Sequence, residues 1–146
     1  MRKLVLATTN HGKIREVLAI LAGVPFELAT LTAWPAVKAP EETGLTFEEN
    51  ARQKALYYAV ATGELTVAED SGLEIDALDG IPGVESARFG GADTTYPEKF
   101  RLIYDALREK GAATSTARFA CALVLAEGDR VLFESRGTVE GRIAPK

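Results

Sequence analysis

The stretch LVLATTNHGKIREVLAIL, residues 4–21, joins a short apolar run to a segment whose apolar residues recur at helical spacing. Between the two lies ATTNHGK, residues 7–13, which contains two threonines, an asparagine, a glycine and a lysine. A turn needs only the asparagine and the glycine. The additional hydroxyl groups and the lysine ammonium suit a strand-to-helix junction that binds an anion at the helix N-terminus.

Each residue of this junction has a chemical reason to contact phosphate. Thr8, Thr9 and Asn10 can donate to phosphate oxygens, Gly12 admits a close backbone approach, and the ammonium of Lys13 can fold back over the first helical turn. The spacing is not that of a Walker A sequence. Taken alone, the stretch fits an ordinary turn with a solvated lysine better than a phosphate site, because short motifs match by chance.

Strand-like and helix-like patterns alternate from this stretch onward, which predicts an α/β layered fold. In the first half we expect a buried strand at 3–8, a helix at 12–22, a strand at 26–31 and a helix at 46–62 that starts with the capping-box pattern TFEE. In the second half we expect a strand at 65–70 that turns at Ser71 and Gly72, a strand-like segment at 71–78, a helix at 96–110 with Phe100, Ile103, Tyr104 and Leu107 inward, and a hairpin of strands 115–126 and 130–139.

Composition limits the kind of protein this can be. The chain has 146 residues, of which 47% are hydrophobic and 26% charged, which fits a single domain spanning residues 1–146. The formal net charge of -4 gives no general attraction to nucleic acid. One cysteine, Cys121, cannot form an internal disulfide, and no stretch approaches the roughly 20 apolar residues of a membrane span. We therefore expect a soluble cytoplasmic protein without nucleic acid or membrane partners.

An acidic loop and the helix after it form a second group of polar residues. EETG, residues 41–44, precedes FEENARQKA, in which Asn50 and Lys54 are four residues apart and share one helical face. An amide and an ammonium on one face, close to two acids, suit a metal-bound polyphosphate. The alternative is a helix whose polar face meets water.

A third group lies in VAEDSG, residues 67–72, where Glu69 and Asp70 close an apolar run. Ligands of open α/β sheets bind at strand ends. Neighbouring strand residues point to opposite faces, so we expect only one of the two acids to reach a site directly. Carboxylate oxygens suit Mg²⁺ or Mn²⁺, and no His/Cys cluster indicates zinc. A polar strand terminus without a ligand is the alternative.

Together, ATTNHGK, EETGLTFEENARQKA and AEDSGLEIDALDGIPGVESARFGG, in this order, resemble the inosine triphosphate pyrophosphatase family. Members of that family remove abnormal purine nucleoside triphosphates such as ITP, dITP and XTP. The resemblance implies an α/β fold with a long central mixed β-sheet flanked by helices, two lobes with an active-site cleft between them, and a homodimer. It also implies Mg²⁺-dependent hydrolysis between the α and β phosphates, which yields the nucleoside monophosphate and pyrophosphate.

The resemblance also implies roles for single residues. Thr8, Asn10 and Lys13 match the triphosphate-binding loop, Lys54 matches a lysine at the phosphates, and Ser71 matches a substrate contact. Glu42 matches a metal-associated glutamate, and Asp70 matches a metal ligand that is also the catalytic base. Glu69, next to Asp70, is a further candidate metal ligand. Mg²⁺ is the expected cofactor, with Mn²⁺ as a substitute.

The chain departs from the family pattern at its end. Family members continue with a glycine-rich FGYDP-type segment, a further lysine and a Ser-His-Arg element, which bind the base. GRIAPK, residues 141–146, stands roughly where that segment begins. We therefore expect a C-terminally incomplete polypeptide that carries the phosphate and metal half of the site. The alternatives are a pyrophosphatase for modified pyrimidine nucleotides and a non-catalytic nucleotide-binding remnant.

Overall fold

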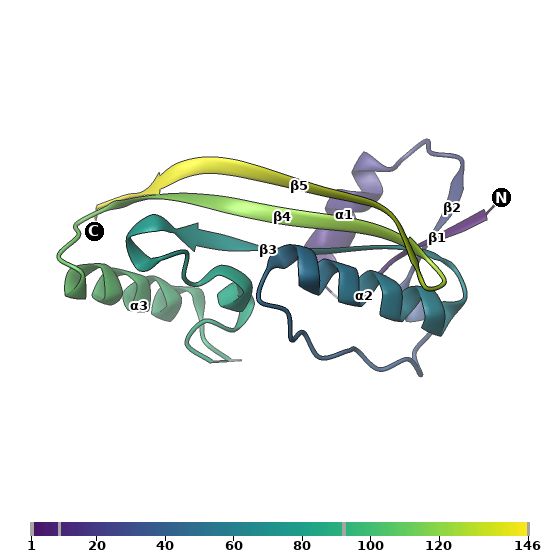
Figure 1. Cartoon of the computed structure of the whole chain (residues 1–146), viewed down its shortest axis with the longest axis horizontal. Coiled ribbons are helices and arrows are strands. Elements are labelled where there is room, and N and C mark those ends of the chain that lie inside the picture. The colour runs from purple at the N-terminus through teal and green to yellow at the C-terminus, as the bar shows by residue number, and fades with distance from the viewer. Residues whose placement is uncertain (1, 9, 92, 146) are drawn as a thin grey trace. The chain divides into compact units, whose positions relative to one another are not determined.

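The computed structural model describes residues 2–8, 10–91 and 93–145, which form a five-stranded sheet and its flanking helices (Figure 1). The elements are β1 (Arg2–Leu6), α1 (His11–Ile20), β2 (Phe26–Thr30), α2 (Phe47–Thr62), β3 (Leu65–Ile75), α3 (Tyr96–Glu109), β4 (Ser115–Glu127) and β5 (Arg130–Ile143). Short 3-10 helices occupy Leu31–Ala33, Asp76–Leu78 and Gly83–Arg88. Within the described ranges, no helix combines the length and apolar character needed to cross a membrane.

The sheet is open, with strand order β2-β1-β3-β4-β5. β1 runs parallel to both β2 and β3, and Leu4 lies opposite Leu28 and Leu65. Consecutive residues of β1 are buried, as expected of a parallel strand covered on both faces. β4 and β5 are antiparallel because the two-residue turn 128–129 joins them. The sheet is therefore mixed, and the predicted α/β class is confirmed.

The loop residues explain where the helices and the hairpin begin. Thr46 caps α2 by accepting a hydrogen bond from Glu49 N at 3.1 Å. The carboxylate of Glu49 accepts from Leu45 N at 3.0 Å, one residue earlier than in the capping box. Gly128 has φ of +59°, the positive angle that the first central residue of a type II′ hairpin turn requires.

The chain divides into two compact units, residues 1–70 with 122–135 and residues 71–121 with 136–146. In the first unit, Ala51, Ala55 and Ala59 repeat every fourth residue on α2 and are all buried. Because these side chains are small, α2 can lie close to the elements it covers. The cleft between lobes that the resemblance implies stays a prediction.

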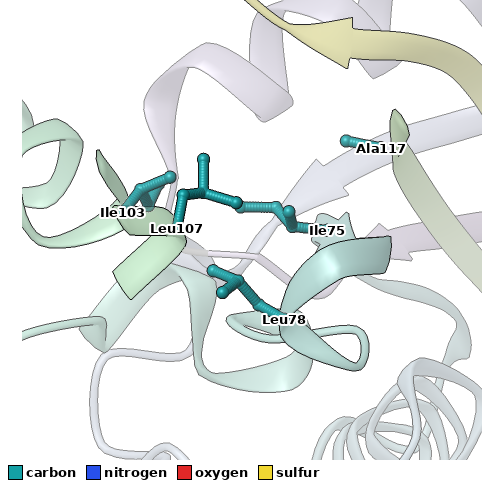
Figure 2. Packing of buried hydrophobic residues seen from close by; sticks show 5 residues of the cluster. All are labelled: Ile75, Leu78, Ile103, Leu107 and Ala117. Carbon is teal, nitrogen blue, oxygen red and sulfur yellow. The ribbon is translucent and has the colours of Figure 1, made fainter. Parts of the chain in front are cut away.

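The second unit has its own apolar core, formed by Ile75, Leu78, Ile103, Leu107 and Ala117. In Figure 2, Leu107 of α3 and Ile75 at the end of β3 point toward each other. The core thus joins α3 to two strands and to the 3-10 turn that follows β3. Its residues follow the helical and strand periods of the sequence.

Phe100 was predicted to point inward from α3, and this prediction is wrong. Its side chain is 55% exposed, whereas Ile103 and Leu107 are buried. The ring of Phe100 lies beside that of Tyr96, with 6.2 Å between ring centroids. The inward stripe of α3 is therefore narrower than the apolar pattern of the sequence suggests.

The predicted turn at Ser71 and Gly72 is also wrong, because β3 runs without interruption from Leu65 to Ile75. Gly72 is a point of close approach. A Cβ atom there would lie 2.4 Å from Ser86 Oγ and 2.6 Å from Gly83 O. Ser86 Oγ accepts from Leu73 N at 2.9 Å and donates to Gly83 O at 2.6 Å. Glu69 and Asp70 consequently lie within a strand rather than at its end.

We expect Gly72→Ala to lower the urea midpoint of unfolding, because the added methyl group would overlap Ser86 Oγ and Gly83 O. The expected loss is about 1–3 kcal/mol, the usual effect of overpacking. Gly137→Ala is the matched control, since Gly137 also lies in a strand and a Cβ there meets nothing within 4 Å. Equal midpoints for the two variants would contradict this interpretation.

Candidate functional site

The loop between β1 and α1 is organised by its own side chains. Asn10 is the N-cap of α1, and its Oδ1 accepts a hydrogen bond from Lys13 N at 3.1 Å. Thr8 Oγ1 accepts from Asn10 N at 3.2 Å. The first turn of α1 carries no acidic side chain, so the positive end of the helix dipole is not offset there. This arrangement leaves a helix N-terminus suited to an anion.

Glycine 12 has a local reason to be glycine. A Cβ atom at this position would lie 3.3 Å from Asn10 Oδ1, which is tighter than an ordinary van der Waals contact. The missing side chain therefore accommodates the capping interaction of Asn10. Thr9, which was predicted to bind substrate, lies outside the described residues.

Two ion pairs, named here the site pairs, join predicted phosphate residues to predicted metal residues. Lys13 Nζ lies 2.7 Å from Glu69 Oε1, and Lys54 Nζ lies 2.8 Å from Glu42 Oε1. All four side chains belong to the first unit. Sequence reasoning named each of the four, but no local pattern indicated which lysine pairs with which glutamate.

Asn50 connects the acidic loop to β3. It is 1% exposed, its Oδ1 accepts from Gly44 N at 2.7 Å, and its Nδ2 donates to Asp70 Oδ2 at 3.1 Å. A Cβ atom at Gly44 would lie 2.6 Å from Asn50 Oδ1, so the loop can make this contact only with glycine. The sequence placed Asn50 on the face of Lys54 but gave no sign of this bridging role.

Asp70 is a buried carboxylate under opposing influences. Burial raises its pKa above the ordinary aspartate value, and the nearby charges of Glu42 and Glu69 act in the same direction. The hydrogen bond from Asn50 and the positive charge of Lys54 lower the pKa, but burial is the largest effect. The result is a carboxylate whose surroundings favour taking up a proton.

The two neighbouring acids of β3 contact side chains of different helices. Glu69 pairs with Lys13 of α1, whereas Asp70 bonds to Asn50 of α2. Successive strand side chains point to opposite faces, which explains the division. Asp70 contacts Asn50 of α2, and the expectation that only one of the two acids reaches a site directly stays a prediction.

The carboxylates around Asp70 fit a hard divalent cation that is shared with phosphate. Within 2–8, 10–91 and 93–145, no three His, Cys, Asp or Glu side chains are grouped closely enough to hold a metal ion by themselves. Mg²⁺ does not need such a cage, since it is commonly bound by one or two carboxylates together with substrate phosphates and water. Oxygen donors of this kind suit Mg²⁺ and Mn²⁺.

A cavity of about 300 Å³ lies in the first unit beside the β1–α1 loop. Thr8, His11, Trp34 and Tyr58 are among its lining residues. Trp34 is an aromatic side chain that could stack on a base there. Phe47 is buried in the core of the unit.

Ser71 follows Asp70 in β3 and is half-buried, but it belongs to the second unit. Its predicted contact with substrate stays a prediction. The structure brings together Lys13 with Glu69, Lys54 with Glu42, and Asp70 with Asn50. Taken with the open α/β sheet, an ammonium group beside a helix N-terminus is typical of proteins that bind phosphorylated ligands.

Comparison with known proteins identifies the family of the chain. The model of the Ham1 family matches residues 4–146. A dITP/XTP pyrophosphatase of Exiguobacterium sp. (strain ATCC BAA-1283 / AT1b) is 45% identical over 141 residues, which cover 97% of this chain and 71% of that protein. The dITP/XTP pyrophosphatase of Gloeobacter violaceus is 48% identical over 143 residues, covering 98% of this chain and 69% of the relative.

A solved structure agrees with the sequence comparison. The HAM1 protein from Coxiella burnetii superimposes with a TM-score of 0.92 at 36% identity, covering 100% of this chain and 75% of that one. The chain belongs to the Ham1 family. This is the family indicated by the three motifs of the sequence.

We expect Asn50→Asp to reduce the free energy of unfolding at pH 7.5 by about 1–3 kcal/mol, because the buried donor to Asp70 is replaced by a second carboxylate. The change keeps an acceptor for Gly44 N. Gln53→Glu is the matched control, since Gln53 bonds to Thr43 through the same two groups on the exposed side of α2. Urea unfolding should show a large loss for the first variant and a small one for the control.

The raised pKa of Asp70 predicts the sign of a pH effect on stability. Above that pKa the folded wild type holds an ionised carboxylate that burial disfavours, so Asp70→Asn should be more stable at pH 7.5. As the pH falls through the raised pKa, wild-type Asp70 protonates and the difference shrinks, vanishing below the ordinary aspartate value of about 3.9. Thermal unfolding in EDTA at several pH values tests this, with Asp129→Asn as an exposed control. A variant less stable than wild type at pH 7.5 would contradict it.

Proposed function

We propose that this chain hydrolyses purine nucleoside triphosphates with abnormal bases, such as dITP and XTP, to the nucleoside monophosphate and pyrophosphate. The observation that carries the proposal is the buried carboxylate of Asp70, held by Asn50 and flanked by the two site pairs. Membership of the Ham1 family and relatives named dITP/XTP pyrophosphatase support the choice of substrate.

The phosphate groups of the substrate are bound by residues of α1, α2 and the loop before α1. Lys13 and Lys54 supply positive charge, and Thr8, Thr9 and Asn10 supply donors. Gly12 keeps the backbone of the first turn accessible to the phosphates, and the N-terminus of α1 adds its partial positive charge. Ser71 makes a further substrate contact.

Mg²⁺ is the proposed cofactor, with Mn²⁺ as a substitute. Asp70 and Glu42 would hold the ion, with Glu69 as a further ligand, and all three offer the oxygen donors it prefers. When bound, the ion neutralises phosphate charge and polarises the phosphoryl group.

Asp70 acts as the general base. It orients a water molecule and takes one of its protons while the water oxygen bonds to the α-phosphorus. The bond between that phosphorus and the oxygen bridging to the β-phosphorus breaks, and the electron pair leaves with pyrophosphate. Lys13 stabilises the negative charge on this leaving group. Asn50 holds Oδ2 of Asp70 by a hydrogen bond and so orients the carboxylate.

We further propose a cytoplasmic homodimer that does not bind nucleic acid. The net charge of -4 supports the absence of nucleic-acid binding. The resemblance to the pyrophosphatase family supports the homodimer. Light scattering of the purified chain measures the dimer directly.

The function is tested by pyrophosphate release from dITP, XTP, dATP and a modified pyrimidine triphosphate in the presence of MgCl₂. We expect release from dITP and XTP, and a loss of at least about 100-fold in kcat for Asp70→Asn, because a general base is removed. Asp129→Asn, in the exposed β4–β5 turn, is the control and should keep wild-type turnover.

Other outcomes distinguish the alternatives. Selective release from the pyrimidine substrate would replace the purine assignment. Nucleotide binding without release from any substrate would identify a non-catalytic nucleotide-binding protein. Unchanged turnover of Asp70→Asn at saturating Mg²⁺ would rule out Asp70 as the base.

A further inference from the structure

The protein itself supplies a partner for each lysine and each glutamate of the candidate site. Lys13 is paired with Glu69, and Lys54 with Glu42, at 2.7 and 2.8 Å. In both site pairs the cation is a proposed phosphate ligand and the anion is a proposed metal ligand. Binding of phosphate or metal must therefore compete with interactions that already exist within the chain.

The site pairs are more sheltered from water than other ion pairs of the first unit. Their side chains are at most 31% exposed, whereas those of Arg2–Glu127 and Arg52–Glu134 are at least 38% exposed. Charges screened less by solvent interact more strongly. A phosphate or a metal ion that binds to a site pair must therefore overcome a stronger interaction than it would at an exposed ion pair.

The site pairs also lie close to one carboxylate. Glu69 directly precedes Asp70 in β3, and Glu42 pairs with Lys54, which lies one helical turn after Asn50, the hydrogen-bond partner of Asp70. Two ammonium groups face three carboxylates here, so negative charge is in excess by one. A polyphosphate that approaches without a cation meets this excess, and a cation that approaches without phosphate must displace lysines from glutamates.

We propose that ligand binding exchanges both site pairs together. Lys13 and Lys54 turn from their glutamates to phosphate oxygens, and Glu42 and Glu69 turn from their lysines to the divalent cation. The proposal rests on the function proposed above, because it needs a ligand that brings phosphate and cation at once. It makes the two components bind with positive coupling, and the coupling is reciprocal.

The exchange predicts effects of opposite sign from a single substitution. Lys54→Met removes the ammonium that competes for Glu42, so Mn²⁺ alone should bind about threefold more tightly, as expected for a partly exposed ion pair. Inorganic pyrophosphate alone, in EDTA, should bind at least about tenfold more weakly, because a charged donor is lost. Electron paramagnetic resonance of unbound Mn²⁺ and calorimetry with pyrophosphate measure the two affinities.

The reverse substitution should give the reverse pattern. Glu42→Gln removes the carboxylate that competes for Lys54, so pyrophosphate in EDTA should bind more tightly and Mn²⁺ more weakly. A misfolded variant would lose both affinities, so opposite signs cannot arise from misfolding.

Arg52→Met is the matched control. Arg52 lies on the same helix, α2, and pairs with Glu134 at 2.7 Å outside the site pairs. The substitution removes the same charge from the same helix without touching a proposed ligand. Both affinities should stay within about twofold of wild type, because exposed charges are largely screened.

Failure of the exchange and failure of the function have different signatures. If wild type releases pyrophosphate from dITP but Lys54→Met binds Mn²⁺ no more tightly than wild type, the exchange is wrong and the function stands. If wild type releases none, the function is wrong, and the Mn²⁺ and pyrophosphate affinities still decide the exchange. Equal shifts for Lys54→Met and Arg52→Met would also overturn the exchange.

Discussion

The buried amide of Asn50 makes the two hydrogen bonds on which the candidate site depends. One bond reaches Gly44, six residues earlier, and the other reaches Asp70, twenty residues later. A single side chain of α2 therefore contacts both the acidic loop and the carboxylate of β3. Because it is buried, losing either partner would leave a polar group without compensation, which is more costly than losing an exposed hydrogen bond.

In this arrangement, burial and hydrogen bonding have opposite effects on the pKa of Asp70. Burial makes ionised Asp70 less favourable, while Asn50 and Lys54 make it more favourable. A general base needs both properties, since it must be ionised to accept a proton and basic enough to hold it. The free-energy cost of keeping this charge inside the protein is thus the feature that supports the proposal of Asp70 as the general base.

Local patterns in the sequence predicted most of the fold. The consecutive apolar residues of β1, the capping threonine of α2 and the two-residue turn before β5 each act over a few positions. Gly72 was misread because glycine within a strand pattern has two causes, a turn or a close approach, and only the position of Ser86 separates them. Phe100 was misread because apolar spacing does not show how wide a helix face is covered.

The sequence named the residues of the candidate site but did not predict their contacts. Lys13, Glu42, Lys54 and Asp70 stand out by their chemistry and by the family resemblance. Their pairing depends on which strand lies beside which helix, and no spacing in the chain encodes that. The bridging role of Asn50 was not predicted for a similar reason, because its two partners come from different elements.

The edge strand β5 affects how chains of the purified protein associate in solution. It is 14 residues long and forms one edge of the sheet. Its Leu132 and Phe133 are exposed. A long open edge is a template on which a second chain can pair, and charged side chains oppose such pairing. Arg130 and Glu134 supply charge next to the two apolar residues. Salt screens these charges without weakening apolar contact, so a higher ionic strength favours pairing at this edge.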